Sequence, residues 1–373
     1  MSDQLNTGIV TRIDEFGESM LSHPKLANAF TQVFSEVKRP TVSIVEVMGP
    51  TGVGKTTLVN KLYRESLNFF SPKMAGNPGL VPVIKVEAAA PENGMFQWLD
   101  LFQRILRELR EPMIECKTLP PAFAVGMENP QKKSTINAMR WAVEQAIRFR
   151  GTSVIIIDEA QHLTKTPNAR RLADQMDVIK SLATQTNAQF VMTGTYELRL
   201  LLNQNGQLAR RIRSVHFGRY NYANEHERQE FINILGMFES RLPLAGNNLL
   251  TSQPEFIYKN CLGCVGILKE WLRTAVERAA QAGRNHFLKG DLAATPLPPA
   301  SLEKIFEEIG EGEQAVANQM REASDWTLKL GLPNTATANA TPAKSVNRPV
   351  GQRKPQRDPV GVPYVEHIFS GSH

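Results

Sequence analysis

Residues 49–56 have the types and the spacing of a loop that binds phosphate. They read Gly-Pro-Thr-Gly-Val-Gly-Lys-Thr and follow the apolar run Ser43 to Met48. Glycine allows the tight turns that point successive backbone N–H groups at phosphate oxygens. A helix that begins near Lys55 adds the positive end of its dipole. This segment therefore predicts a Walker A loop that binds a nucleoside triphosphate.

The side chains of this loop have separate expected tasks. Lys55 is expected to reach the β- and γ-phosphates, and the Thr56 hydroxyl is expected to bind Mg²⁺, which prefers oxygen ligands. Thr57 is the second candidate for that task. The alternative is a glycine turn that precedes a helix by chance. We expect ATP to contact the following residues of the loop and the helix start: Gly49, Pro50, Thr51, Gly52, Val53, Gly54, Lys55, Thr56 and Thr57.

Two adjacent acids form the second half of the predicted site. Four β-branched residues, Val154 to Ile157, are followed by Asp158 and Glu159. This pattern indicates a buried strand with two carboxylates at its end, which is a Walker B signature. Asp158 is expected to hold the Mg²⁺ shell, and Glu159 to polarise the water that attacks the γ-phosphate. The pattern therefore predicts ATP hydrolysis, unless the two acids only cap the strand.

Two further segments complete the expected chemistry. Phe190 to Gly194 predicts the next strand, and Thr195 at its tip is the candidate for sensing the γ-phosphate, with Thr193 second. The segment Leu-Ala-Arg-Arg-Ile-Arg places Arg210 and Arg211 after a turn. In a ring-forming ATPase, an arginine at this place can reach the γ-phosphate of a neighbouring subunit. A solvated role for these arginines is the alternative.

Alternating strands and helices are expected to position these residues. Apolar runs predict strands over 42–48, 81–86, 153–158 and 189–193, and helices over 56–68, 95–109, 134–150 and 168–186. Such alternation indicates an α/β fold, a three-layer αβα core with a parallel sheet. Past Tyr222 the pattern is helical, with helices expected over 224–239, 254–261, 266–282 and 302–330. This part predicts a small all-helical lid.

The chain divides into four expected segments. Residues 1–40 predict short helices that pack on the core, with a break at His23-Pro24. Residues 41–222 form the expected nucleotide-binding core, and residues 223–330 the lid and C-terminal helices. Residues 331–373 are basic, contain proline, and are expected to be disordered. Their end, Val362 to Phe369, is either a hook for a partner or part of an inert terminus.

Composition indicates an intracellular protein. The 373 residues carry a net charge of +6, and 42% of them are hydrophobic. There is no run of 18 apolar residues and no signal-peptide core near Met1, so no membrane segment is expected. The basic balance is compatible with nucleic-acid binding. Cys261 and Cys264 form a lone CxxC pair, which favours small apolar residues at a helix start over a zinc site.

These motifs together resemble those of a known family. The segments GPTGVGKT, IIIDEAQHL, VMTGT and LARRI, followed by a helical lid, are similar to AAA+ ATPases. Within these, the chain looks most like the TniB/TnsC/MuB transposition regulators, the Tn7-like target selectors, with archaeal-type origin-binding ATPases as more distant relatives. The likeness spans about residues 10–285. It implies the AAA+ P-loop fold and a soluble protein of the bacterial cytoplasm.

The resemblance also implies a cycle. Subunits would bind ATP and Mg²⁺ at their interfaces and assemble as a ring or helical filament on double-stranded DNA, without sequence specificity. The homo-oligomer would recruit a transposase and target-selection proteins, and hydrolysis would drive disassembly. Carried over by position, Thr195 senses the γ-phosphate, and Arg210 or Arg211 completes the neighbour's site. One departure is Gly266, where many AAA+ lids carry an arginine; Lys269, one turn on, is the candidate to contact the nucleotide instead.

DNA contacts are expected between the second strand and the Walker B motif. Phosphates of a duplex are bound by lysine, arginine and hydroxyl groups. Arg104 and Arg107 lie three residues apart on one expected helix face and could follow a DNA backbone together. Solvated helix charges are the alternative. The candidates for DNA binding are Arg104, Arg107, Lys117, Lys132 and Lys133.

Three other functions share part of this pattern. A replication initiator or helicase loader shares the core but usually adds a winged-helix module, for which residues 286–330 are too short and too helical. A secretion-associated ATPase also carries the DEAQ sequence but commonly has a membrane segment. A metabolic P-loop kinase would not need the arginine pair.

Overall fold

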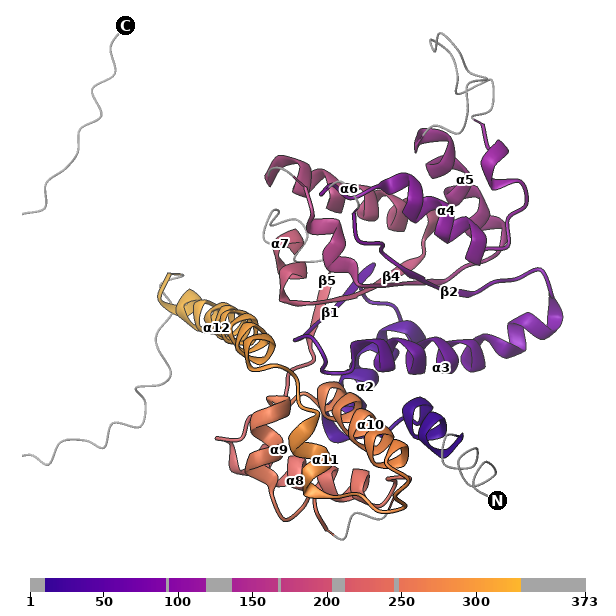
Figure 1. Ribbon diagram of the computed structural model, residues 1–373. Coiled ribbons are helices and arrows are strands. Elements are labelled where there is room, and N and C mark those ends of the chain that lie inside the picture. Colours follow the sequence, from indigo (N-terminus) through magenta and orange to yellow (C-terminus); the bar gives the residue numbers. More distant parts are fainter. Residues whose placement is uncertain are drawn as a thin grey trace, which may run out of the picture. The chain divides into compact units, whose positions relative to one another are not determined.

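Five parallel strands form the centre of the protein. The computed structural model describes residues 11–91, 94–118, 136–166, 169–202, 212–244 and 248–329. The strand order is β2-β3-β4-β1-β5, and every pair in the sheet is parallel. The strands are β1 (Ile44–Met48), β2 (Val83–Glu87), β3 (Val154–Asp158), β4 (Gln189–Gly194) and β5 (Ile212–His216). Figure 1 shows the sheet between two sets of helices.

The register brings the predicted motifs to one edge of the sheet. Met48, the last residue of β1, pairs with Gly194 of β4, and Ile157 of β3 pairs with Met192. Because the strands are parallel, their carboxyl ends lie at the same edge. The Walker A loop after β1, the acids at the end of β3 and the threonines at the end of β4 therefore meet there.

Alternation along the buried strands packs helices on both faces. Ile155 and Ile157 of β3 face α4 (Trp98–Glu108), α5 (Ile136–Phe149) and α6 (Ala169–Thr186). Val154 and Ile156 face α2 (Pro24–Lys38) and α3 (Lys55–Gly76). A short helix, α7 (Arg199–Leu202), follows β4. This is the three-layer αβα arrangement expected from the sequence, as Figure 1 shows.

The C-terminal part of the chain is helical. It contains α8 (Glu225–Glu239), α9 (Pro254–Cys261), α10 (Val265–Gln281), α11 (Lys289–Ala294) and α12 (Pro299–Lys329). Phe231, Leu235, Leu268 and Leu272 form its core, which also includes Phe16 from the helix over residues 11–18. The chain separates into two compact units, Met1–Ala317 and Asn318–His373. The boundaries at 40, 222 and 330 stay predictions, and the tail lies outside the described residues.

Several elements differ from those expected, among them the short helices α7 and α11, which were not predicted from the sequence. β5 is absent from the sequence-based reading because only Val215 is buried in it, as its flanking positions at the sheet edge face solvent. α3 continues to Gly76, past Pro72, whereas the expected helix stops at residue 68. Pro72 has no backbone N–H to donate to the oxygen of Asn68, so α3 continues past it with one backbone hydrogen bond fewer. None of the described helices is both long and apolar enough to cross a membrane.

Candidate nucleotide-binding site

The loop between β1 and α3 is held in a shape that needs glycine. Gly52 and Gly54 have φ angles of 74° and 111°, which L residues with side chains rarely adopt. Gly49 has a different constraint: a Cβ added there would lie 2.1 Å from the backbone oxygen of Phe217. The three glycines thus serve both the turn of the loop and its close packing on the chain after β5.

Lys55 lies inside this loop. Its side chain is buried, and Nζ donates to the backbone oxygens of Gly49, at 3.0 Å, and Pro50, at 2.9 Å. Burial lowers the pKa of the Lys55 ammonium, while the nearby carboxylates of Glu159 and Asp158 act in the opposite direction. These bonds keep the cation at the centre of the loop, where phosphate oxygens would replace the two carbonyls.

Asp158 is fixed at the end of β3. Its Oδ1 accepts from the hydroxyl of Thr193, at 2.6 Å, and from the backbone N–H of Glu159, at 3.0 Å. Both Asp158 and Thr193 are buried. Thr193, the second choice from sequence, therefore orients the carboxylate expected to hold the metal shell. Thr195 lies one residue past the strand, where its side chain faces a cavity.

Glu159 adopts a backbone conformation that is unusual for its residue type. Its φ of 52° is in the left-handed region. This conformation costs free energy in a residue with a side chain, and contacts with the surrounding structure have to offset that cost. Its carboxylate Oε2 accepts a hydrogen bond from Nε2 of Gln161, at 2.5 Å. The strained turn and this bond together fix the direction of the predicted catalytic carboxylate.

Gln161 connects the two strand ends, and the sequence analysis gave it no role. Its amide donates to Glu159, and its Oε1 accepts from the backbone N–H of Thr195, at 3.2 Å. A Cβ added to Gly194 would lie 2.6 Å from this oxygen, so glycine leaves the room that Gln161 occupies. The signal was present in the DEAQ motif: a buried amide must find partners for both its donor and its acceptor.

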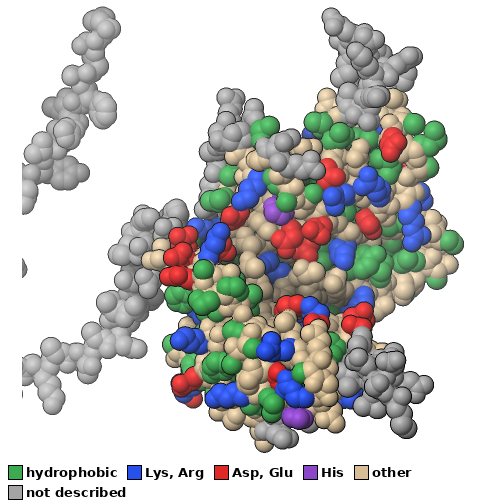
Figure 2. Space-filling model, viewed as in Figure 1, with side chains coloured by type: hydrophobic (Ala, Val, Ile, Leu, Met, Phe, Trp, Pro, Cys, Tyr) green, Lys and Arg blue, Asp and Glu red, His purple; other side chains and the backbone are tan. Residues whose placement is uncertain are grey.

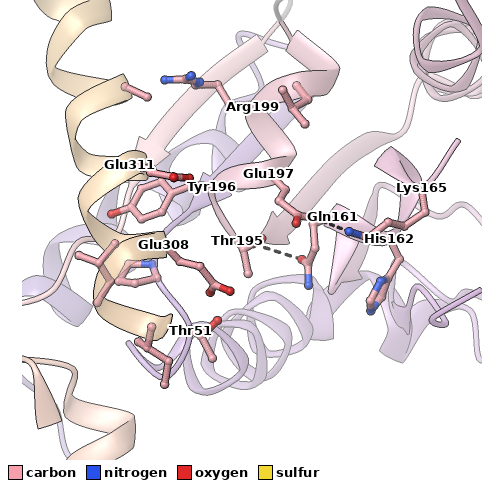
Figure 3. A pocket seen from close by; sticks show the side chains of 16 residues that line it. Thr51, Gln161, His162, Lys165, Thr195, Tyr196, Glu197, Arg199, Glu308 and Glu311 are labelled. Carbon is pink, nitrogen blue, oxygen red and sulfur yellow. Dashed lines mark hydrogen bonds and ion pairs between the residues drawn. The ribbon is translucent and has the colours of Figure 1, made fainter. Parts of the chain in front are cut away.

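A cavity of about 460 Å³ opens beside these groups. It is lined by Thr51 of the Walker A loop, by Gln161, by Thr195 and by residues of α12 that include Glu308 and Glu311. Figure 3 shows the side chains of Thr51, Thr195 and Glu308 facing the same space. The cavity thus borders Thr195, the candidate for sensing the γ-phosphate.

The residues present fit Mg²⁺ that arrives with ATP. Thr56 begins α3 beside Lys55, and Asp158 presents its carboxylate at the end of β3. Over the described ranges, no three His, Cys, Asp or Glu side chains form a metal site. Mg²⁺ bound to nucleotide needs none, because phosphates and waters supply most of its ligands.

Lys269 contacts backbone rather than the loop. Its Nζ donates to the carbonyl oxygens of Gly17, at 2.6 Å, and Ser19, at 2.7 Å. Burial lowers its pKa. The Lys269 ammonium therefore holds the end of the helix over residues 11–18 against α10, and its expected contact with nucleotide stays a prediction.

The glycine at position 266 is required for steric reasons. A Cβ added there would lie 2.5 Å from the backbone oxygen of Gly52, and the neighbouring N–H of Ile267 donates to that oxygen at 3.1 Å. The start of α10 therefore touches the Walker A loop backbone to backbone. No arginine fits at position 266 in this arrangement.

The remaining candidates are placed less centrally. Arg104 pairs with Asp100 and Lys117 pairs with Glu111, at 2.7 Å and 2.9 Å. Arg107 lies in the last turn of α4. Cys261 and Cys264 are buried free thiols, and burial raises the pKa of Cys264 to about 12. Four candidates lie outside the described residues: Lys132, Lys133, Arg210 and Arg211.

A family model matches the central part of the chain. Residues 39–202 match the family described as AAA domain. A five-stranded parallel sheet with flanking helices, a Walker A loop and a helical C-terminal region together form the AAA+ P-loop fold.

The solved structures that match the chain are distant in sequence. The ORC2 protein of Aeropyrum pernix is 15% identical, with a TM-score of 0.48 over 75% of this chain and 70% of that one. The ORC1 protein of Aeropyrum pernix, in complex with DNA, is 17% identical, with a TM-score of 0.47 over 73% and 63%. A Walker-type ATPase of Pyrococcus abyssi is 14% identical, with a TM-score of 0.44 over 81% and 76%. No curated protein matches the chain significantly.

Proposed function

We propose that this protein is a regulatory ATPase of transposition. In this proposal it binds ATP, assembles as a homo-oligomer on duplex DNA, recruits or activates a transposase, and disassembles on hydrolysis. The observation that supports the ATPase activity is the convergence of Lys55, Asp158, Glu159 and Thr193 at one edge of the sheet. The motifs DEAQHL and LARRI support the narrower assignment.

The geometry suggests how hydrolysis proceeds. The triphosphate lies on the backbone N–H groups of the loop, with Lys55 at its β- and γ-phosphates. Thr56 and Asp158 would hold Mg²⁺, which offsets phosphate charge in the transition state. Glu159 accepts the proton of the attacking water, and Gln161 holds the Glu159 carboxylate in place. Thr195 faces the γ-phosphate from the end of β4.

ATP turnover tests the enzymatic half. Glu159→Gln is expected to retain ATP binding and to lose turnover by at least about 100-fold, the lower range for a positioned general base. A matched control is Glu255→Gln, the same change at an exposed residue of α9. Turnover at the wild-type rate by Glu159→Gln would contradict the proposed role of this carboxylate.

Assembly on DNA tests the regulatory half. Electron micrographs with ATP and plasmid DNA should show filaments or rings for the wild type and none for Lys55→Ala. DNA affinity should fall steeply with added salt if phosphates are contacted. Arg104 and Lys117 would then exchange their carboxylate partners for phosphate. A protein that stays monomeric under these conditions would overturn the assignment.

A replication initiator or helicase loader is the alternative within the same fold. After α10, the described chain continues as α11 and α12 rather than as the mixed strands and helices of a winged-helix module. The motifs DEAQHL and LARRI support the transposition regulator. Deleting the gene and measuring transposition separately from replication would decide between the two.

A further inference from the structure

The first part of α12 forms one wall of the cavity at the γ-phosphate end of the site. Up to Ala317 this helix belongs to the same compact unit as the sheet. Ile305, Glu308 and Glu311 line the cavity opposite Thr51 and Thr195. Figure 3 shows α12 running past these residues. The helix therefore lies where any group that approaches a γ-phosphate through the cavity has to pass.

Few contacts hold this part of α12. Gly312 lies against the ring of Tyr196, so closely that an added Cβ would come within 2.0 Å of a ring carbon. Both carboxylate oxygens of Glu313 accept from Arg219, at 3.0 and 3.1 Å. Ile309 is fully buried, whereas Phe306 is 54% exposed. In the described part of the chain, one ring contact, one ion pair, the buried Ile309 and the partly buried Ile305 form a small interface.

The charge of α12 opposes the charge of the expected ligand. Residues 299–318 contain five glutamates and one lysine. Figure 2 shows acidic side chains gathered over this helix. Glu308 and Glu311 face the cavity, and neither forms an ion pair in the part of the chain that the structure describes. A γ-phosphate beside Thr51 and Thr195 would repel both carboxylates.

The cavity is one approach to that phosphate. On its other side Lys55 and Asp158 are buried in the loop and the sheet. An arginine from another subunit that comes through this cavity has to pass α12.

We propose that α12 covers the surface on which a second copy of this chain docks, and that the γ-phosphate of bound ATP displaces it. The inference rests on the ATP-dependent assembly proposed above and states how ATP regulates that assembly. In the ADP-bound or nucleotide-free protein, α12 stays on Tyr196 and Arg219, and the surface is closed. With ATP, repulsion of Glu308 and Glu311 frees α12, and the second copy gains access to Thr51, Gln161 and Thr195.

Two sets of variants of the full chain should shift assembly in opposite directions. Gly312→Val cannot dock on Tyr196, so half-maximal self-association, measured by mass photometry with duplex DNA, should need about tenfold less ATP. The control is Gly310→Val, because a Cβ at Gly310 meets nothing within 4 Å. The double variant Glu308→Gln and Glu311→Gln loses the repulsion and should need about tenfold more ATP. Its control is Glu303→Gln with Glu307→Gln on the same helix.

Hydrogen exchange tests the displacement itself. At a concentration where the protein is monomeric, amides of residues 299–317 should exchange faster with ATP than with ADP. If they stay equally protected, or if Gly312→Val and Gly310→Val behave alike, the inference is wrong while ATP-driven assembly stands. If the wild type never associates, the proposed function fails instead, and the exchange result still decides whether ATP moves α12.

Discussion

Replacing Gln161 tests whether the site depends on the link between its two strand ends. Gln161→Ala removes the donor to Glu159 and the acceptor for the backbone N–H of Thr195. A hydrogen bond to a charged group contributes about 1.5–3 kcal/mol. If this bond is needed in the transition state, kcat should fall roughly 10- to 100-fold, at about 1.4 kcal/mol per factor of ten.

The loss should fall on kcat and spare ATP binding, because Gln161 touches the groups that act on the γ-phosphate and not the loop. Steady-state ATP turnover separates the two, and titration with a fluorescent ATP analogue measures binding directly. Gly194→Ala should reproduce the effect in part, because its Cβ would lie 2.6 Å from Gln161 Oε1. The control is Gly76→Ala, where an added Cβ meets nothing within 4 Å.

The reasoning is refuted if Gln161→Ala keeps kcat within about twofold of the wild type, well short of the loss worked out above. It is also refuted if the whole effect is a weaker affinity for ATP. A general loss of folding would appear as a lower melting temperature, and Gln161→Asn, which keeps the amide on a shorter side chain, should then recover stability without full turnover.

Three other changes follow from the buried polar groups. Thr193→Val removes the donor to Asp158 and should raise the Mg²⁺ concentration needed for half-maximal turnover, measured by metal titration. Burial raises the pKa of Glu46 from 4.5 to about 7, so the stability that its protonated form contributes is full below pH 4.5 and lost as pH rises through 7. In denaturant titrations, Glu46→Gln should flatten that decline by roughly 3 kcal/mol. Lys269→Met should free the helix over residues 11–18, seen as faster hydrogen exchange.

Local sequence patterns were sufficient to predict the central strands of the fold. β-branched runs that end in Met48 and Asp158 predicted β1 and β3 because a strand buried on both faces is mostly apolar, although β1 also contains the buried Glu46. A break between short helices at His23-Pro24 was predicted from proline, and the structure adds that α2 begins at Pro24, with His23 accepting the N–H of Leu26 as its cap. The AAA+ fold follows from these elements in their order.

Contacts between distant segments could not be predicted in this way. β5 has only one buried side chain, and its place beside β1 is set by the sheet rather than by its own pattern. In the sequence, Gln161 is one of several polar residues that follow a strand. Its role becomes visible only in the structure, where it lies beside Gly194 and Thr195. The glycine at position 312 gives no local sign that it lies against Tyr196. In each case the reason for the residue lies in a partner far away in sequence.

The backbone contact between the loop and the lid offers a route for sensing nucleotide without a lid arginine. The N–H of Ile267 donates to the oxygen of Gly52, inside the loop that binds phosphate. Any shift of that loop on binding ATP must move this bond or break it, and α10 begins at the same place. Lys269, one turn further on, ties α10 to the carbonyls of Gly17 and Ser19. A change at the phosphates would thus pass through α10 to the helix over residues 11–18 by hydrogen bonds alone. Gly266 is needed for this coupling, because a side chain there would separate the backbone of α10 from the backbone of the loop.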